Sequence, residues 1–416
     1  MRIIFHIDVN SAYLSWTAVE QLKNGAGVDI RTIPAIIGGD QKSRHGIVLA
    51  KSISAKKYGI RTGEPVANAF RKCPNLHMEA PDHEMYHKHS RELMAFLRSY
   101  TPDIEQVSVD ECYMDFTGIS GRFASPVEAA FEIKDEVKRR FGFTVNIGIS
   151  DVKVLAKMAS DFEKPDRVHT LFRKEIQEKM WPLPISNLFM AGNSSVETLR
   201  KLEIQTIGDL AKADPKLIEL HLKSHGRRLW EFANGMDDSI VESEKAEAKG
   251  VGNSTTLSKD VSTKEDAQKV LLSLAQSVGG RLRKHGYHAG VVNVEIKYAD
   301  FTVNSHQKQL ERMTASDQVI YQTAVELFCE MWNGKPIRLL GIRTSKLSQE
   351  GEPQQLSLFD LNFHSSDNIS EEVKSFENSQ KHEKLDQALD EIRKKFGKDA
   401  VVRASFLKKP EKEEKM

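Results

Sequence analysis

The feature that most restricts the fold is a strand pattern near the N-terminus that ends on a carboxylate. Apolar residues take every second position of Ile3–Val9, and His6 and Asp8 fall on the opposite face. Alternation with a period of two over a short segment indicates a β-strand. A helical pattern follows over about 11–23. The chain therefore opens with a strand and a helix, and Asp8 stands where the strand ends.

Later segments complete an α+β sheet around this strand. In chain order they are a helix, a hairpin, a helix that begins at a capping box, a strand and a helix, and this order is typical of a ferredoxin-like fold. Residues 23–78, with strands over 32–37 and 47–50 and a helix over 54–58, are an insertion into it. The other segments are 83–100 (helix), Glu105–Asp110 and Cys112–Phe116 (hairpin), Ser125–Phe141 (helix), 143–149 (strand) and 152–162 (helix).

The rest of the chain divides by pattern. Residues 170–240 show short helical patterns, and 236–248 are polar with no core pattern, so we expect a linker there. Residues 249–347 follow the order strand, helix, strand, strand, helix, strand, which predicts a second α+β unit. Beyond 348 polar residues dominate until a short amphipathic helix over 381–397. At roughly 100–200 residues per domain, a chain of 416 residues predicts about two to four domains.

Composition excludes several classes of protein. No run of about 18 apolar residues exists, and the N-terminus turns polar too soon for a signal peptide, so we expect a cytoplasmic protein with no membrane partner. Cys73, Cys112 and Cys329 lack zinc or disulfide spacing. Residues 249–346 hold 14 Lys and Arg against 9 Asp and Glu, and residues 350–416 hold 12 against 15. The basic segment suits nucleic-acid contact, although an ordinary solvated surface gives a similar excess.

Three carboxylates are placed to converge. Asp8 ends the first strand, and Asp110 and Glu111 occupy the hairpin turn beside it. Like charges that are buried together need a cation to neutralise them. Hard oxygen ligands suit Mg²⁺, and two such ions about 3.5–4 Å apart stabilise the attacking and leaving oxygens of a phosphoryl transfer. The alternative is three surface acids at strand ends.

Several ordered motifs resemble one family. Asp8–Tyr13, Ser108–Asp115, and Gly148–Ser150 followed by Lys157 and Lys164-Pro165 resemble the Y-family translesion DNA polymerases, most of all the bacterial DNA polymerase IV branch. The resemblance extends over about 1–347. It implies an α+β multidomain, right-hand polymerase that acts as a monomer. Its parts would be a ferredoxin-like palm (1–22 and 79–168), small fingers (23–78), a helical thumb (169–240), a linker (241–248), an α+β little finger (249–347) and a tail (348–416).

The resemblance also implies roles for the site residues. Asp8 and Asp110 would bind both Mg²⁺ ions, Glu111 would hold the catalytic ion near the primer 3′-OH, and the Val9 carbonyl would complete the nucleotide-side ion. Ala12 and Tyr13 would line the nucleotide site. The ring of Tyr13 would be a steric gate that rejects a 2′-hydroxyl by a clash.

Two lysines, Lys56 and Lys164, match positions that contact the triphosphate. Relatives usually have tyrosine and arginine where this chain has Ile53 and Lys56. This departure leaves the strength of triphosphate binding open. After Lys164-Pro165 the family commonly has Asn-Gly, whereas this chain has Asp166-Arg167.

The expected DNA contacts lie outside the palm. Gly192 belongs to a helix-hairpin-helix-like motif that would offer backbone N–H groups to a phosphate, with Met190 and Glu203 where glycine is frequent. The opening strand of the little finger and several arginines would contact the DNA backbone without reading sequence. These residues are Asn253, Ser254, Thr255, Arg281, Arg283, Arg312, Arg338 and Arg343.

An apolar peptide interrupts the polar tail. Gln355, Leu356, Leu358 and Phe359 resemble the bacterial sliding-clamp-binding peptide, whose side chains insert into a groove of the clamp. Tethering of this kind raises the effective concentration of enzyme at a primer end.

The implied function is template-directed, low-fidelity translesion DNA synthesis from dNTPs on primed template DNA, in DNA repair and damage tolerance. Two alternatives stay open at this point. One is a catalytically weak, polymerase-shaped DNA-binding accessory protein that acts at the clamp. The other is a nucleotidyl cyclase built on a similar palm, which would need neither the thumb nor the clamp peptide.

Overall fold

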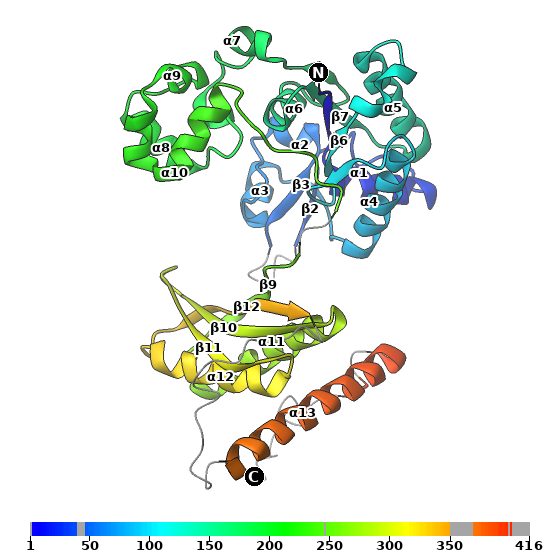
Figure 1. Cartoon of the computed structure of the whole chain (residues 1–416). Helices are drawn as coiled ribbons and strands as arrows, with labels where there is room; N and C mark the ends of the chain where they lie inside the picture. Colours follow the sequence, from blue (N-terminus) through cyan, green and yellow to red (C-terminus); the bar gives the residue numbers. More distant parts are fainter. Residues whose placement is uncertain (1, 40–45, 245–246, 350–368, 398–399, 402–416) are drawn as a thin grey trace. The chain divides into compact units, whose positions relative to one another are not determined.

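The chain forms two compact units, residues 1–245 and 246–416 (Figure 1). The computed structural model describes residues 2–39, 46–244, 247–349, 369–397 and 400–401, and for 369–381 the backbone alone.

A five-stranded sheet forms the centre of the first unit, in the order β5-β6-β1-β7-β8. β1 pairs antiparallel with β6 on one side and with β7 on the other. The expected ferredoxin-like arrangement is therefore confirmed, and β8 adds a parallel edge strand that the sequence pattern did not predict. The strands are β1 (Ile4–Val9), β5 (Ile104–Gln106), β6 (Glu111–Asp115), β7 (Val145–Ser150) and β8 (Val168–Thr170).

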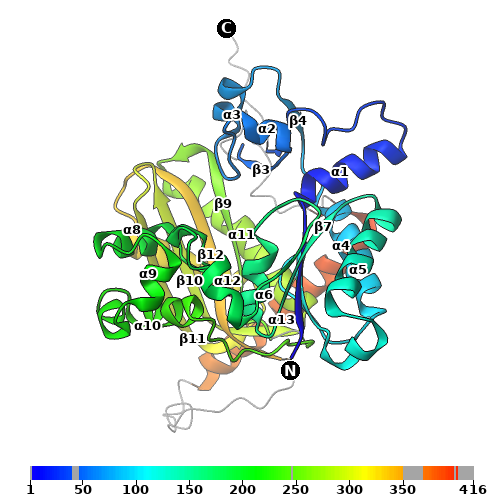
Figure 2. The same cartoon turned by 90° about the horizontal axis from the view of Figure 1, so that it is seen from above.

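Helices cover this sheet on both faces, so all six residues of β1 are buried (Figure 2). Phe5, Ile7 and Val9 pack with residues of α1, α4 and α5 in one core. Ile4 packs on the other face against Ala156 of α6. These helices are α1 (Ala12–Lys23), α4 (His83–Arg98), α5 (Pro126–Phe141) and α6 (Lys153–Ser160), and a 3₁₀ helix, η1 (Thr117–Arg122), follows β6.

The inserted segment forms a small sheet of its own in the order β3-β2-β4. The strands that we expected over 32–37 and 47–50 and the helix over 54–58 are present with slightly shifted ends, whereas α3 and β4 were not predicted. The elements are β2 (Ala35–Gly38), β3 (Val48–Lys51), α2 (Ile53–Lys57), α3 (Val66–Lys72) and β4 (His77–Glu79).

Short helices follow and share one apolar core with α6. They are η2 (Arg173–Glu175), α7 (Ile176–Lys179), η3 (Ile185–Asn187), α8 (Asn193–Lys201), α9 (Ile207–Lys212) and α10 (Pro215–Ala233), and α10 is kinked at Lys223.

The second unit is a four-stranded sheet in the order β11-β10-β12-β9, with α11 and α12 packed on its apolar face. The predicted order of strands and helices is confirmed. The elements are β9 (Gly250–Val261), α11 (Lys264–Lys284), β10 (Tyr287–Tyr298), β11 (Val303–Thr314), α12 (Asp317–Met331) and β12 (Ile337–Gln349).

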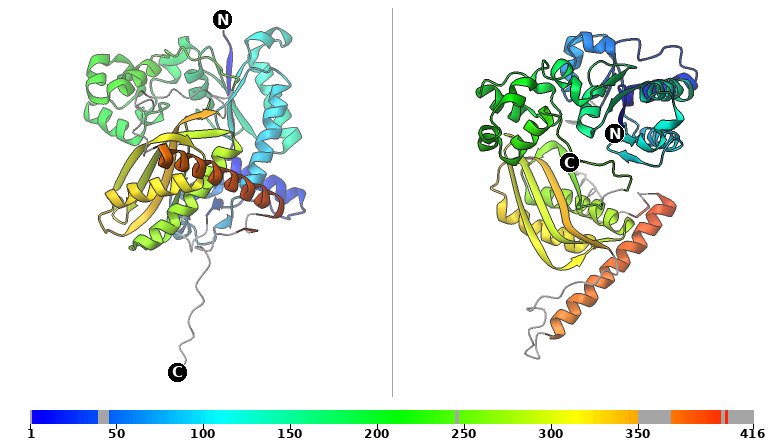
Figure 3. Two further views of the ribbon diagram at one scale, coloured as in Figure 1. Left: turned by 60° about the horizontal axis from the view of Figure 1, so that its bottom comes forward. Right: turned by 45° about the horizontal axis from the view of Figure 1, so that its top comes forward.

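The last helix, α13 (Ile369–Phe396), is longer than the helix expected over 381–397 and lies along α11 and α12 (Figure 3). Among residues 382–396, whose side chains are described, acidic residues make the polar contacts with α11 and α12. Asp386 accepts a hydrogen bond from the N–H of Asp317 at 2.9 Å. The apolar residues Leu385, Ile392 and Phe396 are exposed.

Candidate active site

Strand pairing brings the predicted metal ligands to one end of the palm sheet. Asp8 lies directly opposite Glu111 in the antiparallel ladder of β1 and β6, and residues paired in this way project from the same face. Asp110 precedes β6, and its carbonyl accepts a hydrogen bond from the Val9 N–H at 3.0 Å. The turn that carries Asp110 is therefore joined to the end of β1.

Ser108 organises this turn, and the sequence analysis assigned it no role. Its hydroxyl donates to Asp110 Oδ1 at 2.6 Å and accepts from the N–H groups of Asp110 and Glu111 at 3.2 and 3.0 Å. A serine two residues before an aspartate at a tight turn is the signal that could have identified it. Burial raises the pKa of Asp110, and the negative charges of Asp8 and Glu111 raise it further. A cation at this point would relieve that repulsion.

The side chain of Glu111 is held toward α6. His6 Nε2 lies 3.1 Å and Lys157 Nζ 2.7 Å from its Oε2. The hydrogen bond with His6, together with Lys157, lowers the pKa of Glu111 to about 2 against the opposing effect of burial. Within the described residues, no three His, Cys, Asp or Glu side chains converge as they stand on a metal-binding point. The convergence of all three carboxylates, which needs Glu111 to rotate, stays a prediction.

Lys164 forms an ion pair with Asp8 and a second one with Asp161 at 2.8 Å. Burial opposes its charge, but the two carboxylates outweigh burial and raise the pKa of Lys164. The ammonium group predicted to contact the triphosphate therefore lies against the carboxylate predicted to bind metal.

The loop that carries Lys164 is fixed by Asp166, one of the two residues that stand where the family commonly has Asn-Gly. Asp166 has φ 62°, and its N–H donates to Asn10 Oδ1 at 2.9 Å. Its carboxylate bridges Lys134 and Lys138 of α5 at 2.9 and 2.8 Å. Asn and Asp tolerate the left-handed region better than most residues, so Asp166 suits this position. Its ion pairs also tie the loop to α5.

Tyr13, the predicted steric gate, is packed against a second aromatic ring. It stacks on Tyr86 with ring centroids 4.3 Å apart and an interplanar angle of 7°. The Tyr86 hydroxyl lies 3.2 Å from Thr17 Oγ1, and Tyr86 itself is fully buried. The rotamer of Tyr13 is therefore restricted by a neighbour that cannot move easily.

An open cavity of about 660 Å³ lies between the sheet end and the inserted segment. This volume falls in the range of about 300–1,000 Å³ usual for small-ligand sites. Glu111 does not line it, because its side chain turns toward α6. The predicted site residues that do line it are Asp8, Val9, Ala12, Tyr13, Lys56, Asp110 and Lys164.

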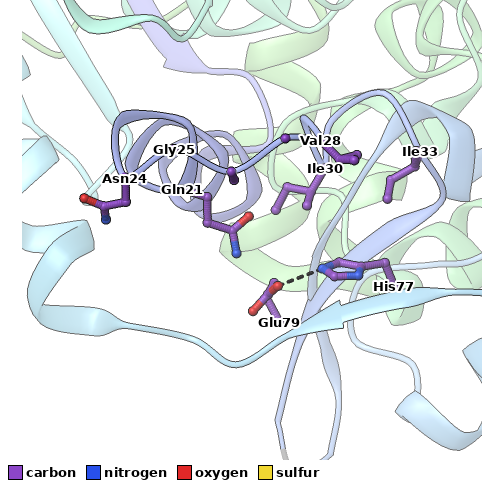
Figure 4. Close-up of a pocket in the computed structure, with 10 residues that line it drawn as sticks. Gln21, Asn24, Gly25, Val28, Ile30, Ile33, His77 and Glu79 are labelled. Atoms are coloured by element: carbon purple, nitrogen blue, oxygen red, sulfur yellow. Dashed lines mark hydrogen bonds and ion pairs between the residues drawn. The ribbon is translucent and has the colours of Figure 1, made fainter.

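A second hollow, of about 630 Å³, lies at the other end of α1 (Figure 4). It is lined by Gln21, Asn24 and an ion pair between His77 Nε2 and Glu79 at 2.7 Å. None of the predicted site residues lines it.

The helix-hairpin-helix-like segment contains two non-glycine residues with a left-handed backbone conformation. Gly192 is the N-cap of α8, and Met190 and Glu203, which stand where glycine is frequent, have φ 67° and 60°. Both residues adopt the left-handed region that glycine enters most readily. The loop geometry is therefore present although the glycines are not.

In the second unit, the sheet face opposite the helices forms a polar hollow of about 720 Å³, lined by Asn253, Ser254 and Arg343 among others. Arg281 donates to the Gly252 carbonyl at 3.0 Å, and Arg338 lies over the Phe301 ring at 4.7 Å. Thr255 of β9 pairs with Leu340 of β12, and Arg312 on β11 is exposed.

The prediction that Arg283 contacts DNA is wrong. Its side chain is 6% exposed and pairs with Asp317 at 2.9 Å, Asp386 at 3.6 Å and Asp390 at 2.7 Å. A guanidinium committed to three carboxylates does not reach a phosphate. The clamp-type residues Gln355, Leu356, Leu358 and Phe359 lie outside the described residues.

A ferredoxin-like palm with Asp8 and Asp110 lining an open cavity at the sheet end fits the class of metal-dependent nucleotidyl transferases. Residues 7–161 match the family model of the impB/mucB/samB family, and residues 248–358 match the model of its C-terminal domain. The chain belongs to the Y family of DNA polymerases, in its DNA polymerase IV branch.

Curated relatives match along nearly their full length. DNA polymerase IV of Clostridium acetobutylicum is 46% identical over 99% of this chain and 100% of its own. DNA polymerase IV of Acetivibrio thermocellus is 36% identical, covering 98% of both chains, and DNA polymerase IV 1 of Bacillus subtilis is 36% identical over 100% of this chain and 95% of its own.

Among solved structures, a Y-family DNA polymerase chimera superposes with a TM-score of 0.73 at 21% identity, over 84% of this chain and 100% of its own, which shows the shared fold. The chain is accordingly a translesion DNA polymerase that uses divalent metal ions, template DNA and dNTPs. The accessory-protein and cyclase alternatives are not favoured. Each described helix is too short or too polar to span a membrane.

Proposed function

We propose that this polymerase joins a dNTP to a primer 3′-OH with two Mg²⁺ ions held by Asp8, Asp110, Glu111 and the Val9 carbonyl. The observation that carries the proposal is the cavity at the sheet end, where Asp8, Val9 and Asp110 present hard oxygen donors. The raised pKa of Asp110 supports it, because a carboxylate destabilised by like charges gains most from a cation. Bound Mg²⁺ would stabilise the charge that develops on the attacking and leaving oxygens.

Binding of a metal ion by Asp8 and binding of the triphosphate by Lys164 would be coupled. Asp8 pairs with Lys164 in the structure. With a cation as its partner, Asp8 would no longer hold Lys164, and the Lys164 ammonium, which also pairs with Asp161, would be available to the triphosphate beside the cavity. Glu111, held in the structure by His6 and Lys157, would be the third carboxylate ligand.

The nucleotide would lie with its sugar over Tyr13 and its triphosphate toward Lys56 and Lys164. Tyr13 excludes a 2′-hydroxyl because Tyr86 behind it prevents the ring from withdrawing. Ala12, at the start of α1, lines the same cavity.

We also propose roles for the segments outside the palm in binding DNA and the sliding clamp. Gly192 of the thumb (169–240) and the little finger (249–347) would hold DNA phosphates without reading sequence, and a linker (241–248) would join the thumb to the little finger. The clamp peptide at 355–359 would tether a monomeric, cytoplasmic enzyme to the sliding clamp. The little-finger residues are Asn253, Ser254, Thr255, Arg281, Arg312, Arg338 and Arg343.

Primer extension with Mg²⁺ and dNTPs tests the metal site. We expect Asp110→Ala to abolish extension while binding of primed DNA is retained. Asp103→Asn, an exposed acid at the start of the same hairpin, is the matched control and should extend normally. If wild type and both variants bind DNA but none extends it, the proposal fails.

A further inference from the structure

The inserted segment presents a second lysine to the nucleotide cavity. Lys51 is the last residue of β3 and lines the cavity together with Lys56 of α2. Its ammonium donates to Thr62 Oγ1 at 3.1 Å, which is a neutral partner. Sequence patterns gave Lys51 no role, because it lies before the segment in which Ile53 and Lys56 depart from the family.

The junction between β3 and α2 fixes the direction of both lysines. Ser52 between them is buried. Its hydroxyl accepts from the N–H of Ala55 at 3.0 Å and donates to the Ile33 carbonyl at 2.7 Å. The Ser52 hydroxyl also accepts from the N–H of Ala35 in β2 at 3.1 Å, so the backbone that carries Lys51 and Lys56 is held to β2 and to the first turn of α2.

Nearby carboxylates are committed to other partners. Glu64 accepts from Lys72 at 2.5 Å and from the Arg61 N–H at 2.9 Å. Arg31, a further cation at the cavity, is paired with Asp29. In the described part of the chain, neither Lys51 nor Lys56 forms an ion pair.

Lys51 and Lys56 have no acidic partner in the described part of the chain, so their positive charges repel each other when no anion is bound. Burial lowers the pKa of Lys51, and the positive charge of Lys56 lowers it further. An anion between them would remove this repulsion and gain two charge-assisted hydrogen bonds. On the opposite wall stand Asp8 and Asp110, which favour cations. The cavity lining therefore includes carboxylates that suit metal ions and, on the inserted segment, two lysines that suit an anion.

We propose that Lys51 is a triphosphate ligand, and that Lys51 and Lys56 together supply the positive charge that relatives place on a single arginine. The inference rests on the proposed function, since it identifies the anion as the triphosphate of a dNTP. Two ammonium groups give separate point charges rather than one rigid fork. The chain thereby replaces the missing tyrosine hydroxyl and guanidinium from a neighbouring strand.

The test compares Lys51→Met, Lys51→Arg and Lys56→Met with Lys57→Met, a control on an exposed residue of α2 that does not line the cavity. Binding of dATP to the enzyme on primed DNA is measured with Ca²⁺ in place of Mg²⁺, and KM and kcat are measured with Mg²⁺. We expect Lys51→Met to weaken dATP binding and to raise KM roughly tenfold, as loss of a hydrogen bond to a charged group implies, with a smaller change in kcat. Lys51→Arg should retain most of the affinity.

Lys57→Met should bind dATP like the wild type, and all variants should unfold at the same temperature. If Lys51→Met binds dATP as tightly as Lys57→Met does, the inference is wrong while the polymerase function stands. If Lys51→Arg loses as much affinity as Lys51→Met, the side chain acts through packing and the inference is again wrong. If the wild type binds dATP but never extends a primer, the proposed function fails, and the Ca²⁺ binding data still decide the role of Lys51.

Discussion

Gly148 on β7 offers a direct test of how the fold positions the site. A Cβ at this position would lie 2.0 Å from the Ala156 carbonyl oxygen, 2.4 Å from the Ser160 nitrogen and 3.0 Å from the Ala159 Cβ. Ordinary van der Waals contact begins at 3.4 Å, so Gly148→Ala requires α6 to move away from the sheet by more than about 1 Å. The nearest obstructing atoms belong to the backbone, so no rotamer change relieves the clash.

The expected loss follows from that geometry. Overpacking typically costs about 1–3 kcal/mol, and a shift of a whole helix places Gly148→Ala at the upper end, about 3 kcal/mol of unfolding free energy. This is a large part of the roughly 5–15 kcal/mol that stabilises a native domain. Gly148 lies opposite His6 in the pairing of β7 with β1, the strand that carries Asp8, so strain at Gly148 would also disturb the sheet end and primer extension should fall further than stability alone explains.

Urea denaturation and primer extension of the full chain measure both effects. Gly118→Ala is the control, because its Cβ would meet no atom within 4 Å and its φ is not in the left-handed region. We expect the control to stay within about 0.5 kcal/mol of the wild type. A Gly148→Ala protein with wild-type midpoint and wild-type activity would refute the argument that backbone contact between β7 and α6 sets the site.

Three further predictions concern other contacts. Tyr86→Leu should raise ribonucleotide insertion relative to deoxynucleotide insertion several-fold, because Tyr13 loses the ring that restricts it; single-nucleotide incorporation measures the ratio, and an unchanged ratio contradicts the stacking argument. Asp166→Ala should lower the unfolding free energy by about 1–3 kcal/mol, because it removes a charged hydrogen-bond partner of Lys134; a urea midpoint equal to that of the wild type contradicts it. Burial raises the pKa of Asp317 to about 6 from the usual 3.8, so the folded state binds more protons between these values and its stability falls as pH rises through them. The difference in unfolding free energy between Asp317→Asn and the wild type should therefore increase from pH 4 to 7 in favour of the variant, by up to about 3 kcal/mol. Parallel pH profiles of the two proteins would contradict this.

The local sequence pattern was sufficient to predict the strands that carry the carboxylates of the site. The alternation in 3–9 and around the hairpin at 105–116 predicted adjacent antiparallel strands. Once these strands pair, the opposition of Asp8 and Glu111 follows from geometry alone. The capping residues Ser125 and Glu128 likewise marked the start of α5, where the Ser125 hydroxyl accepts from the Glu128 N–H.

Local pattern failed where burial depends on elements that are distant in sequence. Arg283 reads as one exposed arginine among several, yet α12 and α13 bring three carboxylates to it and remove it from solvent. The stripe of Leu385, Leu389, Ile392 and Phe396 has helical spacing, yet only Leu389 of these is partly buried, while Asp386 and Asp390 of the same helix pair with Arg283. The spacing of apolar residues in the sequence shows which residues share a face of a helix. The elements that pack against the helix decide which face is buried.

The sequence by itself determined the main strands and helices along the chain, the strand ends at which Asp8, Asp110 and Glu111 stand, and the family, because periodicity and residue type are local properties. The tertiary structure decided the burial and the ion-pair partners of each charged side chain, because both depend on residues that are distant in sequence. It holds Glu111 between His6 and Lys157, pairs Lys164 with Asp8, and brings Lys51 beside Lys56. Coulomb interactions depend on distance and on solvent exposure, and neither quantity is set before the chain has packed.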